Sequence, residues 1–164
     1  MKATQATLVA LVAAIVLTSV AAAGPHAARQ RVAINMKIHP QGTFVLTPLQ
    51  GGPLKSDSGK IKSNWLTIPG RAVVRDGQTL TIYDGAVTTL TGRRGTLTIR
   101  DRNEWLDLGQ DSNRDGESDA IAVSTWKVVR GTGQYAGIVG TGRGGHVGLG
   151  SLWYARYEGL LSLP

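Results

Sequence analysis

Short stretches of alternating apolar and polar residues, each closed by a turn signal, limit the fold of this chain more than any other feature. Residues 32–38 place Val, Ile, Met and Ile on one face, and Pro40 ends the run. Residues 78–83 alternate in the same way after Asp76-Gly77, a dipeptide that accepts the positive φ angles of a tight hairpin. A period of two is typical of a half-buried strand, whereas a helix repeats every 3.6 residues. Because helical spacing lasts no longer than a turn after the N-terminal apolar run, the sequence predicts a domain built of strands.

Eight or nine short strands are expected, and loops rich in Gly, Pro, Ser or acidic residues join them. Such a series is typical of a β-sandwich or a β-barrel. Since few of these runs carry devices that protect an open sheet edge, we expect an antiparallel, closed or nearly closed β-barrel of about eight strands. The glycines concentrated between 131 and 159 indicate turns and bends. The expected strands are 32–38, 42–47, 72–74, 78–83, 87–91, 96–105, 120–130, 135–139 and 152–161.

The first 23 residues have the pattern of a cleavable secretory signal. Lys2 precedes an apolar run without charges, and the run ends in Ala21-Ala22-Ala23, an A-x-A cleavage site. The run is short for a membrane span, which needs about 20 apolar residues, and retention as an anchor is the alternative. We therefore expect a secreted protein with a polar leader over 24–30, a single barrel domain over 31–164 and no membrane association after cleavage.

The composition excludes several classes of site. The chain has no cysteine, which rules out thiol catalysis, disulfides and cysteine-bound zinc. Its three histidines are scattered, and His146 is expected in a glycine-rich turn without a partner. The net charge of +7 is interpreted as serving solubility, and weak contact with anionic molecules outside the cell is the alternative. Because the cations are not clustered among aromatic residues along the sequence, no specific nucleic-acid partner is expected.

In residues 125–140 a strand-like run leads into Gly131-Thr132-Gly133, and Tyr135 and a glycine-bearing run follow. This order resembles a segment shared by allene oxide cyclases and dirigent proteins. Residues 42–48 and Asp57-Ser58-Gly59 look like the start of the same barrel, and the whole mature chain resembles small secreted bacterial proteins of unassigned activity. The resemblance implies an antiparallel barrel with a central cavity, and it assigns no catalytic residue. Gly133 is expected to need a backbone conformation that is closed to β-branched residues.

Four residues are candidates for binding a ligand inside such a barrel. Asp101 and Asn103 share a strand face with Leu97 and Ile99, so an unbroken strand would carry polar groups into the cavity. The simpler interpretation, which we prefer from the sequence, is that the strand reaches the rim at Asp101 and both residues meet water. The aromatic candidates for the same cavity are Trp126 and Tyr157.

The acidic stretch 111–119 partly matches a calcium loop. Oxygen-bearing side chains occupy positions 1, 3, 5, 7 and 9, and glycine occupies position 6. Ala122 stands where an EF-hand places its bidentate glutamate, and the flanks look like strands, so a plain acidic loop is the alternative. The candidate ligands of a weak calcium site are Asp111, Asn113, Asp115, Glu117 and Asp119.

Three functions remain open at the level of sequence. We expect a secreted module that binds a small apolar or phenolic molecule in its cavity. An isomerase or cyclase of the allene oxide cyclase or dirigent type is the first alternative, and a calcium-supported structural or interaction protein is the second. A hydrogen-bonding or charged group deep in the cavity would favour the enzyme over a simple carrier.

Overall fold

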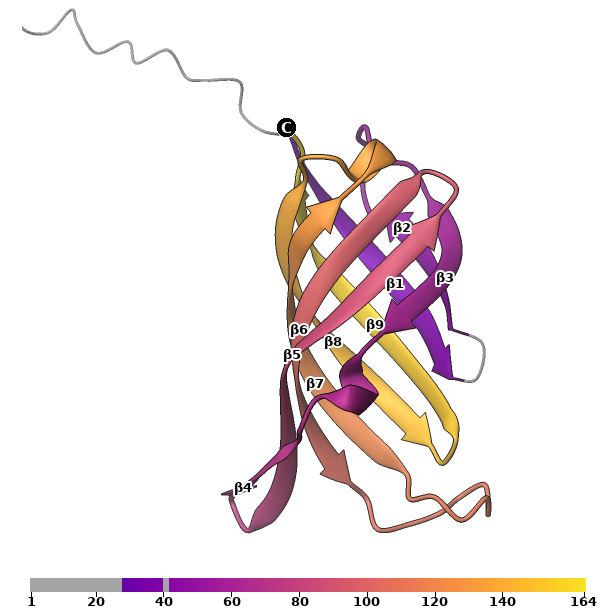
Figure 1. Cartoon of the computed structure of the whole chain (residues 1–164), viewed down its shortest axis with the longest axis vertical. Helices are drawn as coiled ribbons and strands as arrows, with labels where there is room; N and C mark the ends of the chain where they lie inside the picture. Colours follow the sequence, from indigo (N-terminus) through magenta and orange to yellow (C-terminus); the bar gives the residue numbers. More distant parts are fainter. Residues whose placement is uncertain (1–27, 40–41) are drawn as a thin grey trace, which may run out of the picture.

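The computed structural model describes residues 28–39 and 42–164, and this part of the chain forms one antiparallel sheet of nine strands (Figure 1). The expected signal peptide and most of the leader lie outside the described residues. The two short 3-10 helices are η1 (Trp65–Thr67) and η2 (Gly133–Tyr135). The strands are β1 (Arg29–His39), β2 (Thr43–Pro48), β3 (Asp57–Ser63), β4 (Arg71–Arg75), β5 (Gln78–Gly92), β6 (Gly95–Asp107), β7 (Ala120–Gly131), β8 (Val139–Leu149) and β9 (Leu152–Ser162).

Eight of the strands close into a ring through hydrogen bonds. The order is β3-β2-β1-β9-β8-β7-β6-β5, and β3 then pairs with the second half of β5. The first half of β5 pairs with β4, which stays outside the ring and projects from one end of it (Figure 1). The prediction of an antiparallel, nearly closed barrel of about eight strands is therefore confirmed.

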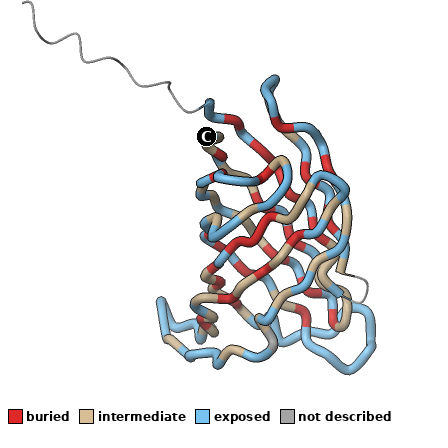
Figure 2. The backbone as a smooth tube through the Cα atoms, turned by 45° about the horizontal axis from the view of Figure 1, so that its top comes forward, coloured by how far each residue is buried: buried red, intermediate tan, exposed pale blue. Residues whose placement is uncertain are grey.

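Along the strands of the ring, buried residues that face the interior alternate with more exposed residues that face outward, as Figure 2 shows. In β1 the side chains of Val32, Ile34 and Met36 are buried, as the sequence predicted. Their neighbours in the same cluster come from most of the ring and include Phe44, Leu46, Leu90, Leu97, Ile99, Trp126, Tyr157 and Leu161.

One end of the barrel is closed by hydrogen bonds between strands and loops. Gln30 donates to the carbonyl oxygens of Gln50 and Leu54 and accepts from the Leu54 N–H. The carboxylate of Asp57 accepts from Tyr135 Oη at 3.1 Å and from the backbone N–H of Arg93 at 3.1 Å. These bonds satisfy buried polar groups over the apolar core at this end of the barrel.

The main departure from the expected strands lies in the glycine-rich stretch. Residues 139–149 form β8, where turns were expected. Of the strand expected over 135–139, Tyr135 ends η2 and residues 136–138 lie outside any strand. Glycine is required here for close approach: a Cβ on Gly144 would lie 2.1 Å from Tyr157 Cδ1, and one on Gly142 would lie 2.5 Å from the Trp126 ring. The glycines of β8 thus leave space for two large rings that cross the barrel interior.

Smaller departures have local causes. Residues 78–92 form a single strand, because the break expected near Asp84 is a bulge at which Gly85 has φ +86°. The strand β3 begins at Asp57, inside the segment expected to be a loop, and β1 begins at Arg29, inside the expected leader. Gly133 has φ +60°, as its predicted role in the turn requires. Within the described residues no helix is long and apolar enough to cross a membrane.

Candidate functional site

A cluster of polar side chains lies inside the barrel beyond the apolar core. Asp101 and Asn103 come from β6, Ser124 from β7, His146 from β8 and Tyr157 from β9, and all five are buried. The Asp101 carboxylate accepts from Asn103 Nδ2 at 3.0 Å and from Tyr157 Oη at 2.9 Å. Ser124 donates to Asn103 Oδ1 at 2.5 Å. Four adjacent strands thus hold one connected hydrogen-bond network.

The position of Asp101 and Asn103 corrects the interpretation preferred from the sequence. They were expected to meet water at the rim, yet only 5% of Asp101 and 4% of Asn103 is exposed. The strand β6 continues past them to Trp105, which is also buried. Its pairing with β7 is regular from Asp101 to Trp105, and the bulge opposite Asp101 lies in the neighbouring strand β5. The inner face of β6 therefore stays inside the barrel over its whole length.

His146 was expected in a turn without a partner, and this expectation is wrong. It lies in β8 with 7% of its surface exposed, and its Nε2 is 2.9 Å from Tyr157 Oη. The other ring nitrogen, Nδ1, is buried and has no hydrogen-bond partner among the described residues. A buried polar atom without a partner costs free energy. A water or a ligand that forms a hydrogen bond with Nδ1 would therefore stabilise the site.

Burial controls the charges in this cluster. Loss of hydration raises the pKa of Asp101 above its usual range, although hydrogen bonds from Tyr157 and Asn103 act in the opposite direction. Loss of hydration also lowers the pKa of His146 to about 4, which keeps the imidazole neutral at pH 7. The pKa of Tyr157 is raised by burial and by the charge of Asp101, so its hydroxyl keeps its proton.

Aromatic side chains cover the polar cluster at the open end. Trp65, from η1, stacks on Trp105 at 6.2 Å between ring centroids and lies 4.6 Å from the ring of Trp153. Trp105 in turn lies 5.1 Å from the imidazole of His146. The edge-to-face contact of Trp65 with Tyr83 completes the group. The imidazole is thus separated from the open end by flat apolar surfaces.

Two spaces meet at this aromatic cover. The inner one has a volume of about 20 Å³, enough for one water, and Asp101, His146 and Tyr157 are among its lining residues. The outer one is an open hollow of about 360 Å³. Trp65 and Trp153 line both spaces, together with Ile38, Ile61 and Ser63, so the two tryptophans form part of the wall between them.

The structure shows where the four residues predicted to bind a ligand lie, and their role in binding stays a prediction. The structure brings Asp101, Asn103 and Tyr157 to the inner space, whereas Trp126 lies behind Tyr157, stacked on it at 6.2 Å and 8°. Sequence reasoning missed His146, Trp65 and Trp153. For His146 the alternation of glycines at 140, 142 and 144 was a usable signal, because it continues at period two into position 146.

The acidic loop uses its side chains to hold its own backbone. The Asp111 carboxylate accepts from the N–H groups of residues 115 and 116, and Asp115 accepts from Ser151 at 2.7 Å and from Glu117 at 3.1 Å. The N–H of Ser151 holds the pKa of Asp115 at about 2. Asp119 is buried and accepts from Ser112 N at 3.2 Å.

Within the described ranges, no three His, Asp or Glu side chains are arranged to hold a metal ion. The calcium hypothesis for Asp111, Asn113, Asp115, Glu117 and Asp119 therefore rests on their spacing in the sequence.

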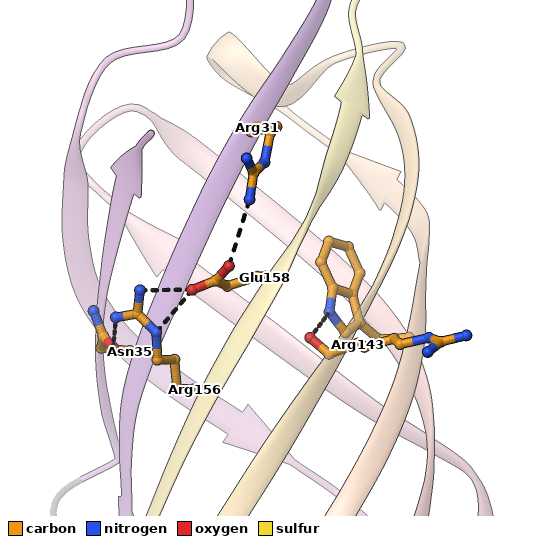
Figure 3. A network of polar contacts seen from close by, with 6 residues as sticks. Arg31, Asn35, Arg143, Arg156 and Glu158 are labelled. Atoms are coloured by element: carbon orange, nitrogen blue, oxygen red, sulfur yellow. Dashed lines mark hydrogen bonds and ion pairs between the residues drawn. The ribbon is translucent and has the colours of Figure 1, made fainter. Parts of the chain in front are cut away.

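The outer wall carries charged groups that the register brings together. Arg156 donates to Glu158 and to Asn35, and Arg31 lies 3.8 Å from Glu158 (Figure 3). Further round the barrel a shallow hollow is bordered by four cations from β6, β7 and β8, and also by Asp84 and Asp101. These cations are Arg100, Arg102, Lys127 and Arg143.

Comparison with known proteins adds no family to this description. No family model matches the chain, and neither a curated protein nor a solved structure matches it. Three features of the structure therefore bear on its function: the eight-stranded ring, the buried polar network and the aromatic cover of that network.

Proposed function

We propose that the protein is a secreted module that binds a small aromatic molecule with a hydroxyl group, such as a phenol, at the open end of its barrel. The observation that carries this proposal is the unpartnered Nδ1 of His146 beneath the tryptophan cover. A neutral imidazole that donates from Nε2 accepts at Nδ1. A phenolic hydroxyl supplies the missing donor. The ring of the phenol packs against the aromatic cover in place of a tryptophan ring.

Binding requires Trp65 to move. The inner space holds only one water, whereas small-molecule pockets usually measure about 300–1,000 Å³. Trp65 belongs to η1, outside the ring of strands, and Asn64 joins this segment to β5 through hydrogen bonds with Val87. If Trp65 swings outward, the inner space joins the open hollow of about 360 Å³, and the sum suits a ligand of one or two rings.

The apolar run with its A-x-A site supports export, and the ring of strands supports the part of the resemblance to allene oxide cyclases and dirigent proteins that concerns architecture. An isomerase or cyclase is the second candidate. It is favoured by a specific observation, because a carboxyl group and an imidazole lie deep inside the barrel, where a simple carrier of apolar molecules needs neither.

A pair of matched ligands tests the binding proposal. The protein used is residues 24–164. We expect it to bind 2-naphthol about five- to tenfold more tightly than 2-methoxynaphthalene, since the methyl ether lacks the hydroxyl group that donates to His146. Isothermal titration calorimetry measures both affinities, and quenching of tryptophan fluorescence reports the change at Trp65. In His146→Phe the two affinities should become equal.

The proposal fails if neither compound binds. It also fails if the unsubstituted protein binds both compounds equally well, because the donor to His146 is then irrelevant. Val123→Ala on the exposed face of β7 is the control that should bind both compounds as the unsubstituted protein does.

A further inference from the structure

Three groups inside the barrel form a continuous line of hydrogen bonds from three strands. Asp101 Oδ2 is 2.9 Å from Tyr157 Oη, and Tyr157 Oη is 2.9 Å from His146 Nε2. The other carboxyl oxygen of Asp101 is held by Asn103 Nδ2 at 3.0 Å. The line therefore has one fixed end at Asp101 and one unpartnered end at His146 Nδ1.

Counting protons along this line leaves two arrangements. Tyr157 has one hydroxyl proton and donates in one direction only. When Asp101 is ionised, Tyr157 donates to it, His146 donates from Nε2, and Nδ1 is a free acceptor. When Asp101 is protonated, it donates to Tyr157, Tyr157 donates to Nε2, and Nδ1 carries the imidazole proton. The imidazole is neutral in both arrangements, and they differ by one proton in total.

We propose that Asp101, Tyr157 and His146 form a proton relay through which the barrel isomerises small aromatic carbonyl compounds that have an acidic C–H group. This step rests on the proposed binding function, since the substrate occupies the same place as the phenol. His146 is the catalytic residue because it meets the substrate, and Tyr157 and Asp101 are positioning residues that act through it.

The proton movements balance without a cofactor. Nδ1 of His146 takes the proton from the carbon next to the carbonyl, and the electron pair of that C–H bond becomes the enolate. The Nε2 proton passes to Tyr157, and the Tyr157 proton passes to Asp101. Where the substrate has a C=C bond conjugated with the enolate, return of the proton by the same route to the far carbon of that C=C bond gives the isomer with the double bond moved next to the carbonyl. The negative charge thus moves from Asp101 to the substrate and back.

The surroundings suit this exchange of charge. The hydroxyl groups of Ser63 and Thr88 line the same space, 2.9 Å apart, and can donate to the enolate oxygen. Burial disfavours the ionised form of Asp101, so the carboxylate gains by accepting a proton. Of the described residues that line the space, those that titrate are Asp101, His146, Tyr157 and Tyr83, and none is a lysine or arginine.

The tautomer of His146 tests the relay without any substrate. In Asp101→Asn the side-chain oxygen accepts from Asn103, and the amide group then donates to Tyr157. Tyr157 must donate to Nε2, so Nδ1 carries the proton at every pH. In the unsubstituted protein the ¹⁵N spectrum of His146 should change from the Nδ1–H form to the Nε2–H form as Asp101 ionises. The same tautomer in both proteins at high pH overturns the relay.

Deuterium exchange tests the chemistry. The probe is 2-tetralone in D₂O, and proton NMR follows the loss of its α-hydrogens. The unsubstituted protein should accelerate exchange at least tenfold over Tyr157→Phe, which keeps the ring and breaks the line in its middle. Calorimetry with 2-tetralone on both proteins separates the two proposals. Binding of 2-tetralone with equal exchange rates overturns the relay as a catalyst, and so does absence of 2-tetralone binding to a protein that binds 2-naphthol. Absence of binding of both compounds overturns the proposed function.

Discussion

Gly144→Ala is expected to destabilise the barrel strongly, although it adds only one methyl group to a strand. The new Cβ would lie 2.1 Å from Tyr157 Cδ1 and 2.7 Å from the carbonyl oxygen of Arg156, so one of these neighbours has to move. Overpacking of this kind costs about 1–3 kcal/mol. The Tyr157 ring cannot move without weakening its hydrogen bonds to Asp101 and His146, which are worth about 1 kcal/mol each. We therefore expect a loss of about 3 kcal/mol in the free energy of unfolding.

Gly145→Ala is the matched control in the same strand. Its Cβ would meet nothing nearer than the carbonyl oxygen of Ala122 at 3.4 Å, an ordinary contact distance. Replacing glycine by alanine without strain stabilises by about 0.4–1 kcal/mol, because the unfolded chain loses conformational freedom. Urea unfolding followed by far-UV circular dichroism measures both variants, and equal m-values would show that the unfolding reaction is the same.

A double substitution shows whether the ring is the cause. In a Tyr157→Leu background the ring atom that meets the new Cβ is absent, whereas the contact with the Arg156 carbonyl oxygen at 2.7 Å remains. The cost of Gly144→Ala should therefore fall by at least about 1 kcal/mol in this background. If Gly144→Ala and Gly145→Ala differ by less than about 0.5 kcal/mol, or if the cost persists with leucine at 157, the glycine does not serve to admit the tyrosine ring.

Three further predictions concern other parts of the molecule. Gly133→Val should cost about 1–3 kcal/mol or more, since φ is +60° and the Cβ would lie 2.2 Å from the Arg94 carbonyl oxygen, whereas Gly51→Val, with nothing within 4 Å, should stay within about 0.5 kcal/mol in urea unfolding. Between pH 6.5 and about 4 the unfolded chain binds a proton at His146 that the folded protein does not. The free energy of unfolding should therefore fall by up to about 3 kcal/mol as the pH drops through this window. In pH-dependent melts, His146→Gln should remove this part of the slope. Millimolar CaCl₂ should leave the melting temperature unchanged, because backbone N–H groups already occupy the loop carboxylates; a rise that disappears in Asp115→Ala would instead support a calcium site.

The barrel architecture could be predicted because the alternation of apolar and polar residues that buries one face of a strand can be recognised from a few consecutive residues. Val32, Ile34 and Met36 in β1 are an example, and the Asp76-Gly77 hairpin is another. The pairing of β3 with β5 could not be predicted in this way. It joins Gly59 to Gly92 across two intervening turns and an extra strand, and such a register depends on the closure of the whole ring.

The candidate site could be predicted as far as the face of one strand. Asp101 and Asn103 do share the inner face of β6 with Leu97 and Ile99, as the period of two indicated. Trp65 could not be found in the same way, because it comes from a single turn of 3-10 helix whose position depends on Asn64 and the neighbouring strands. A residue on such a segment has no periodic signal.

The two errors about the site have one physical origin, which is the strand β8. Glycine has no side chain to alternate, so the inner positions 140, 142 and 144 give no apolar signal, and the stretch resembles a series of turns. Without β8 the ring is open between β7 and β9, and a carboxylate on its inner face is expected to meet water. With β8 in place, Gly144 leaves space for the Tyr157 ring. His146, two residues further along the same face of β8, contacts the Tyr157 hydroxyl. The same glycines that hide the strand from sequence analysis therefore make the room in which Asp101, Tyr157 and His146 meet.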